Sequence, residues 1–395
     1  MTHNFDEIIE RRSSGCFKWT QYEADVLPMT VADMDFRAPG PILEALQERV
    51  NHGLFGYEWP RDDLLQLICQ RMKRVYNWTV LPEEVVILPG LRVGLSLVSA
   101  ALSDGSNAAI TFTPVYPPFF GAATSHGMTS QTVPLKLITD GAILRYEMDL
   151  ERFTATLTKS TKLLQFCNPQ NPVGRSFTVE ELRQIGDICV KRDMVICSDE
   201  IHCDLLMGDT KHTPFACVSP EISDRCITLM SPSKTFNISG LGAAYAIIQN
   251  QELRHRFKKT VQGVHAEINM AGIAAFKAAY TYCDPWVVEL CQYLSRNRDL
   301  YQEFVLNNFP QIKTTIPEAT YLTWLDCRQL GIAGPPYEFF LKNARVALND
   351  GAPFGEGGEG FVRFNFACPR SQMIMALERM QAALVQAGLV AQRSR

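Results

Sequence analysis

The sequence predicts an α/β protein in which a mainly parallel sheet lies between helices, with a smaller α+β region beside it. Short apolar runs alternate with helical patterns through the middle of the chain. One of these helices, 178–192, opens with a capping box formed by Thr178 and Glu181. Beyond about residue 285 the order changes to a long helix, two strand patterns and a last helix. Strands separated by amphipathic helices are typical of βαβ units, whereas the later order is typical of an α+β domain.

The expected elements follow from apolar runs and their spacing. Strands are expected at residues 85–88, 108–112, 162–167, 194–199, 226–231 and 242–248, and later at 320–326 and 360–366. Helices are expected at residues 92–102, 178–192, 285–309 and 371–387. We therefore expect a large domain over 51–284, and a small domain that combines 1–50 with 285–395.

Composition excludes several classes of protein. A net charge of −4 without a basic stripe makes nucleic acids and anionic membranes poor partners. No apolar run reaches the roughly 20 residues that span a bilayer, and the N-terminal segment lacks the apolar core of a secretory signal. The 12 cysteines contain no C-x-x-C pair and are expected to be free thiols in a reducing cytoplasm. No metal site is predicted, because Cys197, His202 and Cys203 lack a second pair of ligands at zinc-finger spacing.

Two motifs are weak. Gly355, Gly357 and Gly360 match G-x-G-x-x-G, but they precede a strand instead of following one, so we interpret them as a turn. Ser231 to Lys234 matches the S-x-x-K motif of serine acyl-transferases. That family also carries S-D-N and K-T-G, and neither occurs in this chain. Lys234 therefore needs another explanation, and its neighbours supply one.

The chemical groups around Lys234 meet the requirements of pyridoxal 5′-phosphate (PLP). This cofactor needs an amine for its aldehyde, donors for its phosphate, an anion beside its pyridine nitrogen and a donor for its phenolic oxygen. A helix that begins after a glycine turn offers free N–H groups to a phosphate. The candidates for phosphate binding are Gly90, Leu91 and Arg92 at such a turn, together with the hydroxyls of Ser231 and Ser233.

Four further residues suit the cofactor ring. Asp199 ends a predicted strand, at the sheet edge where ligands bind, and would keep the pyridine nitrogen protonated. His202 would lie one turn beyond Asp199 on the same face if that segment is helical; a structural role for this lone histidine stays open. Asn171, between two prolines, is a candidate donor for the phenolic oxygen, and Tyr116 for stacking on the ring.

Arg363 is the candidate for substrate binding. It lies in the predicted strand 360–366, and a guanidinium binds a carboxylate through two parallel hydrogen bonds. The alternative is an exposed strand arginine. Together these residues predict a PLP enzyme with a small-molecule amino-acid substrate.

The chain resembles the class I/II aminotransferase family of fold-type I PLP enzymes. Three motifs carry the resemblance in the family's order: NPQNPVG (168–174), SDEIH (198–202) and SPSKTFNISGLG (231–242). The resemblance implies a seven-stranded, mainly parallel sheet in the large domain. It also implies that Lys234 holds PLP as a Schiff base and then acts as the base at the substrate Cα, with Asp199, Asn171, Tyr116 and Arg363 in the roles above.

A closer resemblance is to MalY/PatB-type cystathionine β-lyases. It rests on CFKWTQYEADVLPMTVADMDF (16–36), HGLFGY (52–57) and GEGGEGFVRFNFACPR (355–370). It implies α,β-elimination on L-cystathionine or related cysteine S-conjugates, and a homodimer in which Tyr57 reaches the phosphate of the neighbouring subunit. His202 replaces the tyrosine that many aminotransferases carry, and the segment after Lys234 lacks an arginine; both departures favour the lyase group.

Two other functions stay open on the sequence. An aminotransferase would use the same residues and return the proton to the cofactor instead of expelling a β-group. A non-catalytic protein with this fold would act as a regulator or binding module, which the intact Lys234, Asp199, Asn171 and Arg363 argue against.

Overall fold

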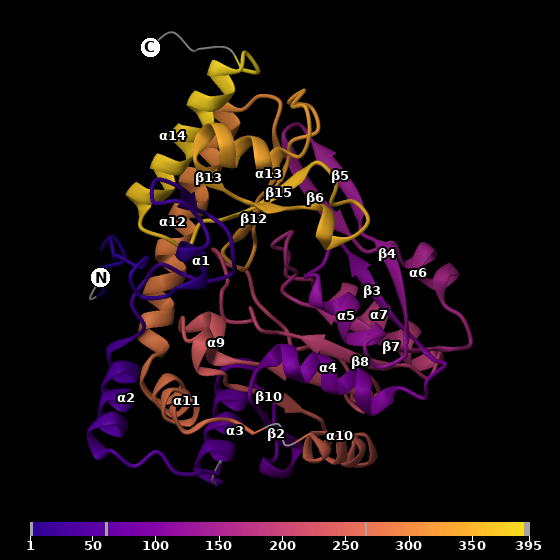
Figure 1. The fold of residues 1–395 in the computed structure, drawn as a ribbon. Helices are drawn as coiled ribbons and strands as arrows, with labels where there is room; N and C mark the ends of the chain where they lie inside the picture. Colours follow the sequence, from indigo (N-terminus) through magenta and orange to yellow (C-terminus); the bar gives the residue numbers. More distant parts are fainter. Residues whose placement is uncertain (1–2, 60–61, 265–266, 391–395) are drawn as a thin grey trace.

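The computed structural model describes residues 3–59, 62–264 and 267–390. A seven-stranded sheet and a six-stranded sheet organise this part of the chain. Figure 1 shows how their strands and the surrounding helices are arranged. Within it, no helix is both long enough and apolar enough to cross a bilayer.

The seven-stranded sheet confirms the predicted fold class. Its spatial order is β2-β10-β9-β8-β7-β3-β4, and only β10 runs antiparallel to its neighbours. The strands are β2 Val85–Leu88, β10 Ala244–Ile247, β9 Cys226–Met230, β8 Val195–Asp199, β7 Thr161–Cys167, β3 Ala108–Thr113 and β4 Thr129–Pro134. All but β4 coincide with apolar runs recognised in the sequence.

Helices bury both faces of this sheet, which is why its central strands read as continuous apolar runs. Along β9, Ile227 and Leu229 pack into one hydrophobic cluster and Cys226 and Met230 into the other. One face is covered by α4 Leu91–Leu102, α5 Pro118–Thr124 and α10 Gln251–Gly263, and the other by α3 Asp62–Tyr76, α7 Val179–Lys191, α8 Pro220–Ser223 and α11 Met270–Tyr282. The capping box of α7 is formed as predicted: the Thr178 hydroxyl accepts from the Glu181 N–H at 3.2 Å, and Glu181 Oε2 accepts from the Thr178 N–H at 2.8 Å.

The six-stranded sheet lies above the first in Figure 1. Its order is β14-β15-β12-β11-β6-β5, with β14 Asn349–Asp350, β15 Phe361–Asn365, β12 Leu322–Asp326, β11 Lys313–Thr315, β6 Ile143–Glu147 and β5 Lys136–Asp140. Its long helices are α12 Asp284–Asn308 and α14 Arg370–Gln386. Strands β5 and β6 lie within 51–284, the range expected for the large domain, but they belong to the six-stranded sheet. The sheets therefore do not follow the predicted domain boundary at these two strands. The domain division itself stays a prediction.

The N-terminal segment connects the two halves. Strand β1 Leu27–Pro28 pairs in parallel with β13 Val346–Ala347, and helix α2 Gly40–His52 packs against α11 (Figure 1). The remaining helices are short: α1 Phe17–Thr20, α6 Leu150–Thr156, α9 Pro232–Thr235 and α13 Pro336–Phe339. The three glycines of the G-x-G-x-x-G match lie in a turn before β15 with φ of 94°, 87° and 78°, as their interpretation as a turn requires.

Candidate active site

A cavity of about 430 Å³ lies at the carboxyl ends of the parallel strands. Ten of the twelve predicted site residues line it: Gly90, Leu91, Arg92, Tyr116, Asn171, Asp199, His202, Ser233, Lys234 and Arg363. They come from six separate segments of the chain. The two that do not line it are Ser231 and Tyr57.

Lys234 reaches the cavity from the single turn α9, directly after β9. Its Nζ donates to the Ala32 carbonyl at 2.6 Å and to the Ser239 hydroxyl at 3.2 Å. Burial lowers the pKa of Lys234 to about 8. The nearby carboxylates of Asp33 and Asp199 favour the charged amine and offset only part of this shift. A buried amine with a lowered pKa is a ready nucleophile toward an aldehyde.

Asp199 ends β8 inside the same cavity. Its Oδ1 accepts a hydrogen bond from the Ile201 N–H at 3.1 Å, and no salt bridge to it occurs among the described residues. Burial raises the pKa of Asp199 to about 7. A cation beside this carboxylate would lower its pKa again, and a protonated pyridine nitrogen is such a cation.

Arg363 is buried, with 4% of its surface exposed, so the alternative of an exposed strand arginine is wrong. Its guanidinium donates to Asn171 Oδ1 at 3.0 Å and to Asn349 Oδ1 at 2.7 Å. Burial lowers the pKa of Arg363 to about 10, and its Nε has no hydrogen-bond partner in the described part of the chain. A buried cation held by neutral amides fits a substrate carboxylate. Because Arg363 occupies Oδ1 of Asn171, the amide N–H groups of Asn171 remain available as donors.

The anion-binding end of the cavity is the start of α4. No side chain caps this helix, so the N–H groups of its first turn are free. A Cβ added at Gly90 would meet no atom within 4 Å, which leaves room beside these donors. Ser233 lines the cavity here. Ser231 lies behind it: its hydroxyl is 2.5 Å from the Ala243 carbonyl and 2.8 Å from Ser233 Oγ, so it shapes the turn instead of facing the cavity.

The segment after Asp199 is a turn and not the helix considered for it. The buried Glu200 carboxylate bonds Ser198, His212 and the Phe215 N–H, which pulls the chain inward. His202 nevertheless reaches the cavity, and its ring packs edge-on against the Tyr321 ring with 5.9 Å between the ring centroids. Burial lowers the pKa of His202 to about 3, so the ring is neutral, and its Nδ1 is buried without a partner among the described residues.

Tyr116 and Tyr57 differ in their surroundings. Tyr116 follows β3 and turns into the cavity, where burial raises its pKa. Tyr57 is fully exposed and lies in a stretch without helix or strand, 53–59. Among the described residues of this one chain, no contact brings Tyr57 to the cavity.

Three of the lining residues that had no role in the sequence interpretation contact predicted site residues. Ala32 and Ser239 contact Lys234, and Asn349 contacts Arg363. Ala32 lies in the segment 16–36, which was noted only for its resemblance to a family. Ser239 lies in the motif 231–242. Asn349 belongs to a two-residue strand without a sequence signature.

The donors, the carboxylate and the amine are the set that PLP requires, so the residues present fit this cofactor. Residues 24–380 match the family described as aminotransferase class I and II. Over nearly their whole lengths, the chain is 37% identical to "Cystathionine beta-lyase PatB" of Bacillus subtilis (96% of this chain, 100% of that protein) and 32% identical to "Protein MalY" of Escherichia coli (97% and 98%).

Solved structures agree with these relatives. The PLP-bound C-S lyase from Staphylococcus hominis superposes with a TM-score of 0.90 at 34% identity, covering 98% of this chain and 99% of that one. Cystalysin from Treponema denticola, which contains PLP, has a TM-score of 0.90 at 31% identity, with 98% and 100% covered. The chain therefore belongs to the class I and II aminotransferase family, and within it is similar to the PatB and MalY proteins, as the motifs predicted.

Proposed function

We propose that this protein is a PLP-dependent carbon–sulfur β-lyase. It acts on L-cystathionine or related cysteine S-conjugates by α,β-elimination and releases a thiol (homocysteine from cystathionine), pyruvate and ammonia. The observation that carries the proposal is one cavity in which the amine of Lys234 faces the carboxylate of Asp199 and the unneutralised guanidinium of Arg363. The similarity to cystathionine β-lyases selects elimination among the reactions that such a cavity supports.

The chain's residues divide the work as follows. Arg363 binds the substrate α-carboxylate and so orients the Cα–H bond. Lys234 would hold the cofactor through its Nζ and, as the free amine, would take the Cα proton. The electron pair of the Cα–H bond then forms a Cα=Cβ bond, the Cβ–S bond breaks, and its electron pair leaves with the thiolate. Water hydrolyses the enamine that remains to pyruvate and ammonia. PLP, when bound, supplies an electron sink for the pair left at Cα.

The other predicted residues hold the cofactor. Asp199 keeps the pyridine nitrogen protonated, Asn171 donates to the phenolic oxygen, and Tyr116 stacks on the ring. Gly90, Leu91 and Arg92 at the start of α4, with Ser233, bind the phosphate, and Ser231 fixes Ser233. We place His202 near the phenolic oxygen or the substrate, as a neutral group.

An assay without a 2-oxo acid tests the function. The purified protein with PLP is expected to release pyruvate and homocysteine from L-cystathionine in equal amounts when no acceptor is added. An aminotransferase would instead require a 2-oxo acid for turnover, and this requirement would overturn the lyase proposal. Absence of both activities, with PLP bound, would favour the non-catalytic alternative.

The lowered pKa of Lys234 leads to a pH prediction. Only the neutral amine attacks an aldehyde, so capture of PLP by the cofactor-free protein should speed up with pH and level off above about 8. With a lysine of the ordinary pKa of 10.5, the rate of PLP capture would continue to rise well above pH 8. Stopped-flow absorbance across this pH range measures the midpoint, and a midpoint near 10 would show that the amine is not buried in this way.

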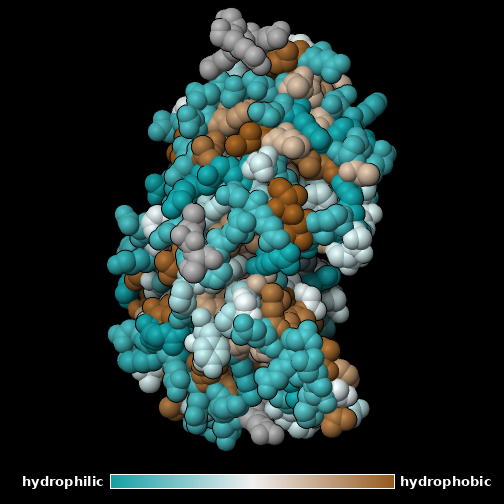
Figure 2. All heavy atoms as spheres, turned by 90° about the vertical axis from the view of Figure 1, so that its left-hand side faces the viewer, coloured by the Kyte–Doolittle hydropathy of each residue, from teal (hydrophilic) through white to brown (hydrophobic). Residues whose placement is uncertain are grey.

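We propose a homodimer with shared active sites as the functional unit. The stretch 53–59 carries Leu54, Phe55 and Trp59 with two thirds of their surface exposed, besides the fully exposed Tyr57. Figure 2 shows the face on the α2 side, where hydrophobic side chains reach the surface among hydrophilic ones. Exposed aromatic residues in such a stretch are typical of an interface. We propose a cytoplasmic location for this dimer, which the free cysteines support because thiols stay reduced in that compartment.

Mixing two inactive variants tests the shared site. If Tyr57 serves the partner's phosphate, a hybrid of Lys234→Ala and Tyr57→Ala subunits contains one site with both residues intact. The mixture, after subunit exchange, should therefore be clearly more active than either parent. A mixture of Lys234→Ala with Asp199→Ala should show no gain, because both residues belong to the same chain's cavity. No gain in the first mixture would remove the proposed role of Tyr57.

A further inference from the structure

Ser239 contacts Lys234 and has no part in the function proposed above. It begins a single helical turn, Ser239–Leu241, five residues beyond Lys234, and it lines the cavity. Its Oγ lies 3.2 Å from Lys234 Nζ.

The direction of this hydrogen bond is set by a third residue. The Ser239 hydroxyl donates its one hydrogen to the Ser233 carbonyl at 3.4 Å. A hydroxyl that has donated its hydrogen can only accept from another group. Ser239 therefore accepts from Lys234, and does so in both protonation states of the amine.

The Ala32 carbonyl is a second acceptor, 2.6 Å from the same Nζ. A neutral primary amine has two N–H bonds and one lone pair. When Ser239 and Ala32 each accept one N–H, the lone pair is the only part of the amine left for another partner. The two acceptors thus fix the direction in which Lys234 attracts a proton.

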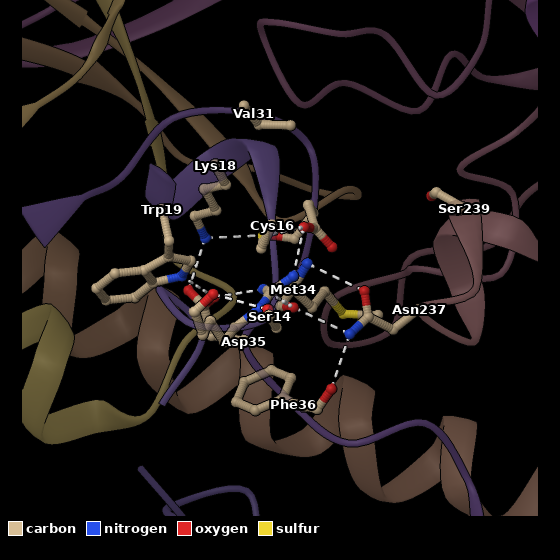
Figure 3. Close-up of polar contacts among 12 residues, drawn as sticks. Ser14, Cys16, Lys18, Trp19, Val31, Met34, Asp35, Phe36, Asn237 and Ser239 are labelled. Atoms are coloured by element: carbon tan, nitrogen blue, oxygen red, sulfur yellow. Dashed lines mark hydrogen bonds and ion pairs between the residues drawn. The ribbon is translucent and has the colours of Figure 1, made fainter. Parts of the chain in front are cut away.

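The segment that carries Ala32 is held rigidly from the N-terminal side. Arg11 donates to Asp35 at 2.6 Å and to Asp33 at 2.8 Å, and the fully buried Lys18 bonds Asp35 at 2.6 Å. Trp19 Nε1 completes this cluster at 2.8 Å from Asp35, as Figure 3 shows. Asp35 is buried, and cations on a buried carboxylate make its position costly to change.

The same segment is tied to the loop that carries Ser239. Asn237 Oδ1 accepts from the Met34 N–H at 3.2 Å, and its Nδ2 donates to the carbonyls of Met34 at 2.9 Å and Phe36 at 2.7 Å (Figure 3). Val31, next to Ala32, has a φ of 49°, which a β-branched residue adopts only when its surroundings impose it. The distance between the two acceptors is therefore built into the fold.

We propose that Ser239 is a positioning residue for Lys234, which acts with the Ala32 carbonyl to aim the lone pair of the free amine at the substrate Cα. The inference rests on the proposed role of Lys234 as the base. It assigns Ser239 no contact with the substrate.

Loss of Ser239 should change the pKa of Lys234 in a definite direction. The charged and titratable groups that face Lys234 are Asp33, Asp199, Arg363 and His202, and none of them changes in a Ser239→Ala variant. An acceptor stabilises the ammonium form more than the neutral amine. Its removal should therefore lower the pKa of Lys234.

The test compares Ser239→Ala, Ser239→Thr and wild type in two measurements. For the cofactor-free full chain, the pH midpoint of PLP capture should fall by about half a unit to one unit in Ser239→Ala. For the enzyme with PLP, kcat for pyruvate release should fall by about 3- to 10-fold with little change in KM. Ser239→Thr keeps the hydroxyl, and Ser239 is exposed toward the cavity, so this variant should restore both values.

Ser125→Ala is the matched control. Ser125 is an exposed serine whose hydroxyl also bonds a backbone carbonyl, at the end of α5, and both measurements should stay at wild-type values. The titrations of PLP itself are common to all variants and cancel in the comparison. An unchanged midpoint in Ser239→Ala, or an equal loss in Ser239→Thr, would overturn the proposal. Failure of wild type to release pyruvate would instead overturn the proposed function, while the capture midpoint would still report on Ser239.

Discussion

Lys234→Ala protein is expected to fold, to lose covalent attachment of PLP and to lose turnover by about 10⁴-fold. Two steps need this one amine, because it holds the cofactor and then takes the Cα proton. Folding should survive, since the substitution removes a buried amine whose lowered pKa marks it as costly in its charged form. Borohydride reduction followed by peptide mass analysis measures the attachment, and pyruvate release measures turnover.

The control for this variant is Lys159→Ala. Lys159 is an exposed lysine in the turn before β7, and its replacement should leave both measurements unchanged. Turnover of Lys234→Ala at a tenth of the wild-type rate or more would contradict both the attachment site and the identity of the base.

Asp199→Asn should have opposite effects on activity and on stability. Activity should fall by about 10²- to 10³-fold, because an amide cannot hold the pyridine nitrogen protonated. The cofactor-free protein should meanwhile become more stable above pH 7. The folded pKa of Asp199, about 7, lies above the ordinary aspartate value of 3.8, so the folded state prefers the protonated form. The contribution of Asp199 to the stability of the wild-type cofactor-free protein is therefore most favourable at low pH. It is lost as the pH rises from about 4 to about 7, by up to about 4 kcal/mol.

Thermal unfolding of the cofactor-free proteins at pH 5 and pH 8 tests this sign. The gain in Asp199→Asn should appear at pH 8 and be much smaller at pH 5. Asp209→Asn, which changes an exposed aspartate, should show no such difference. If Asp199→Asn were less stable than wild type at pH 8, the surroundings of Asp199 would already stabilise its ionised form. The carboxylate would then not require a cation beside it.

The two variants separate the parts of the proposed mechanism. Lys234→Ala removes the group that moves the proton, whereas Asp199→Asn leaves that group in place and weakens the acceptance of electrons at Cα. The proposed division of roles predicts that only Lys234→Ala loses PLP attachment, whereas both variants lose activity.

The sequence was sufficient to predict the large sheet and ten of the residues that line the cavity. The central strands are buried on both faces, so they appear as apolar runs, and each predicted site residue after β7, β8 or β9 follows such a run. Strands β4 and β5 were not recognised because they are partly exposed and rich in polar residues. The inclusion of β5 and β6 in the second sheet depends on a parallel pairing with β11, more than 160 residues away, which no local pattern encodes.

The tertiary structure alone decided how the cavity residues act on one another. Residue types and order identified Lys234, Asp199, Asn171 and Arg363 as a set for PLP. Only the folded chain shows that Asn171 is oriented by Arg363, that Ser231 stands behind Ser233, and that the N-terminal segment brings the Ala32 carbonyl to Lys234 from 202 positions away. The physical reason is that motifs record which chemical groups a site needs, whereas pKa values and hydrogen-bond directions arise from burial and from contacts between distant segments.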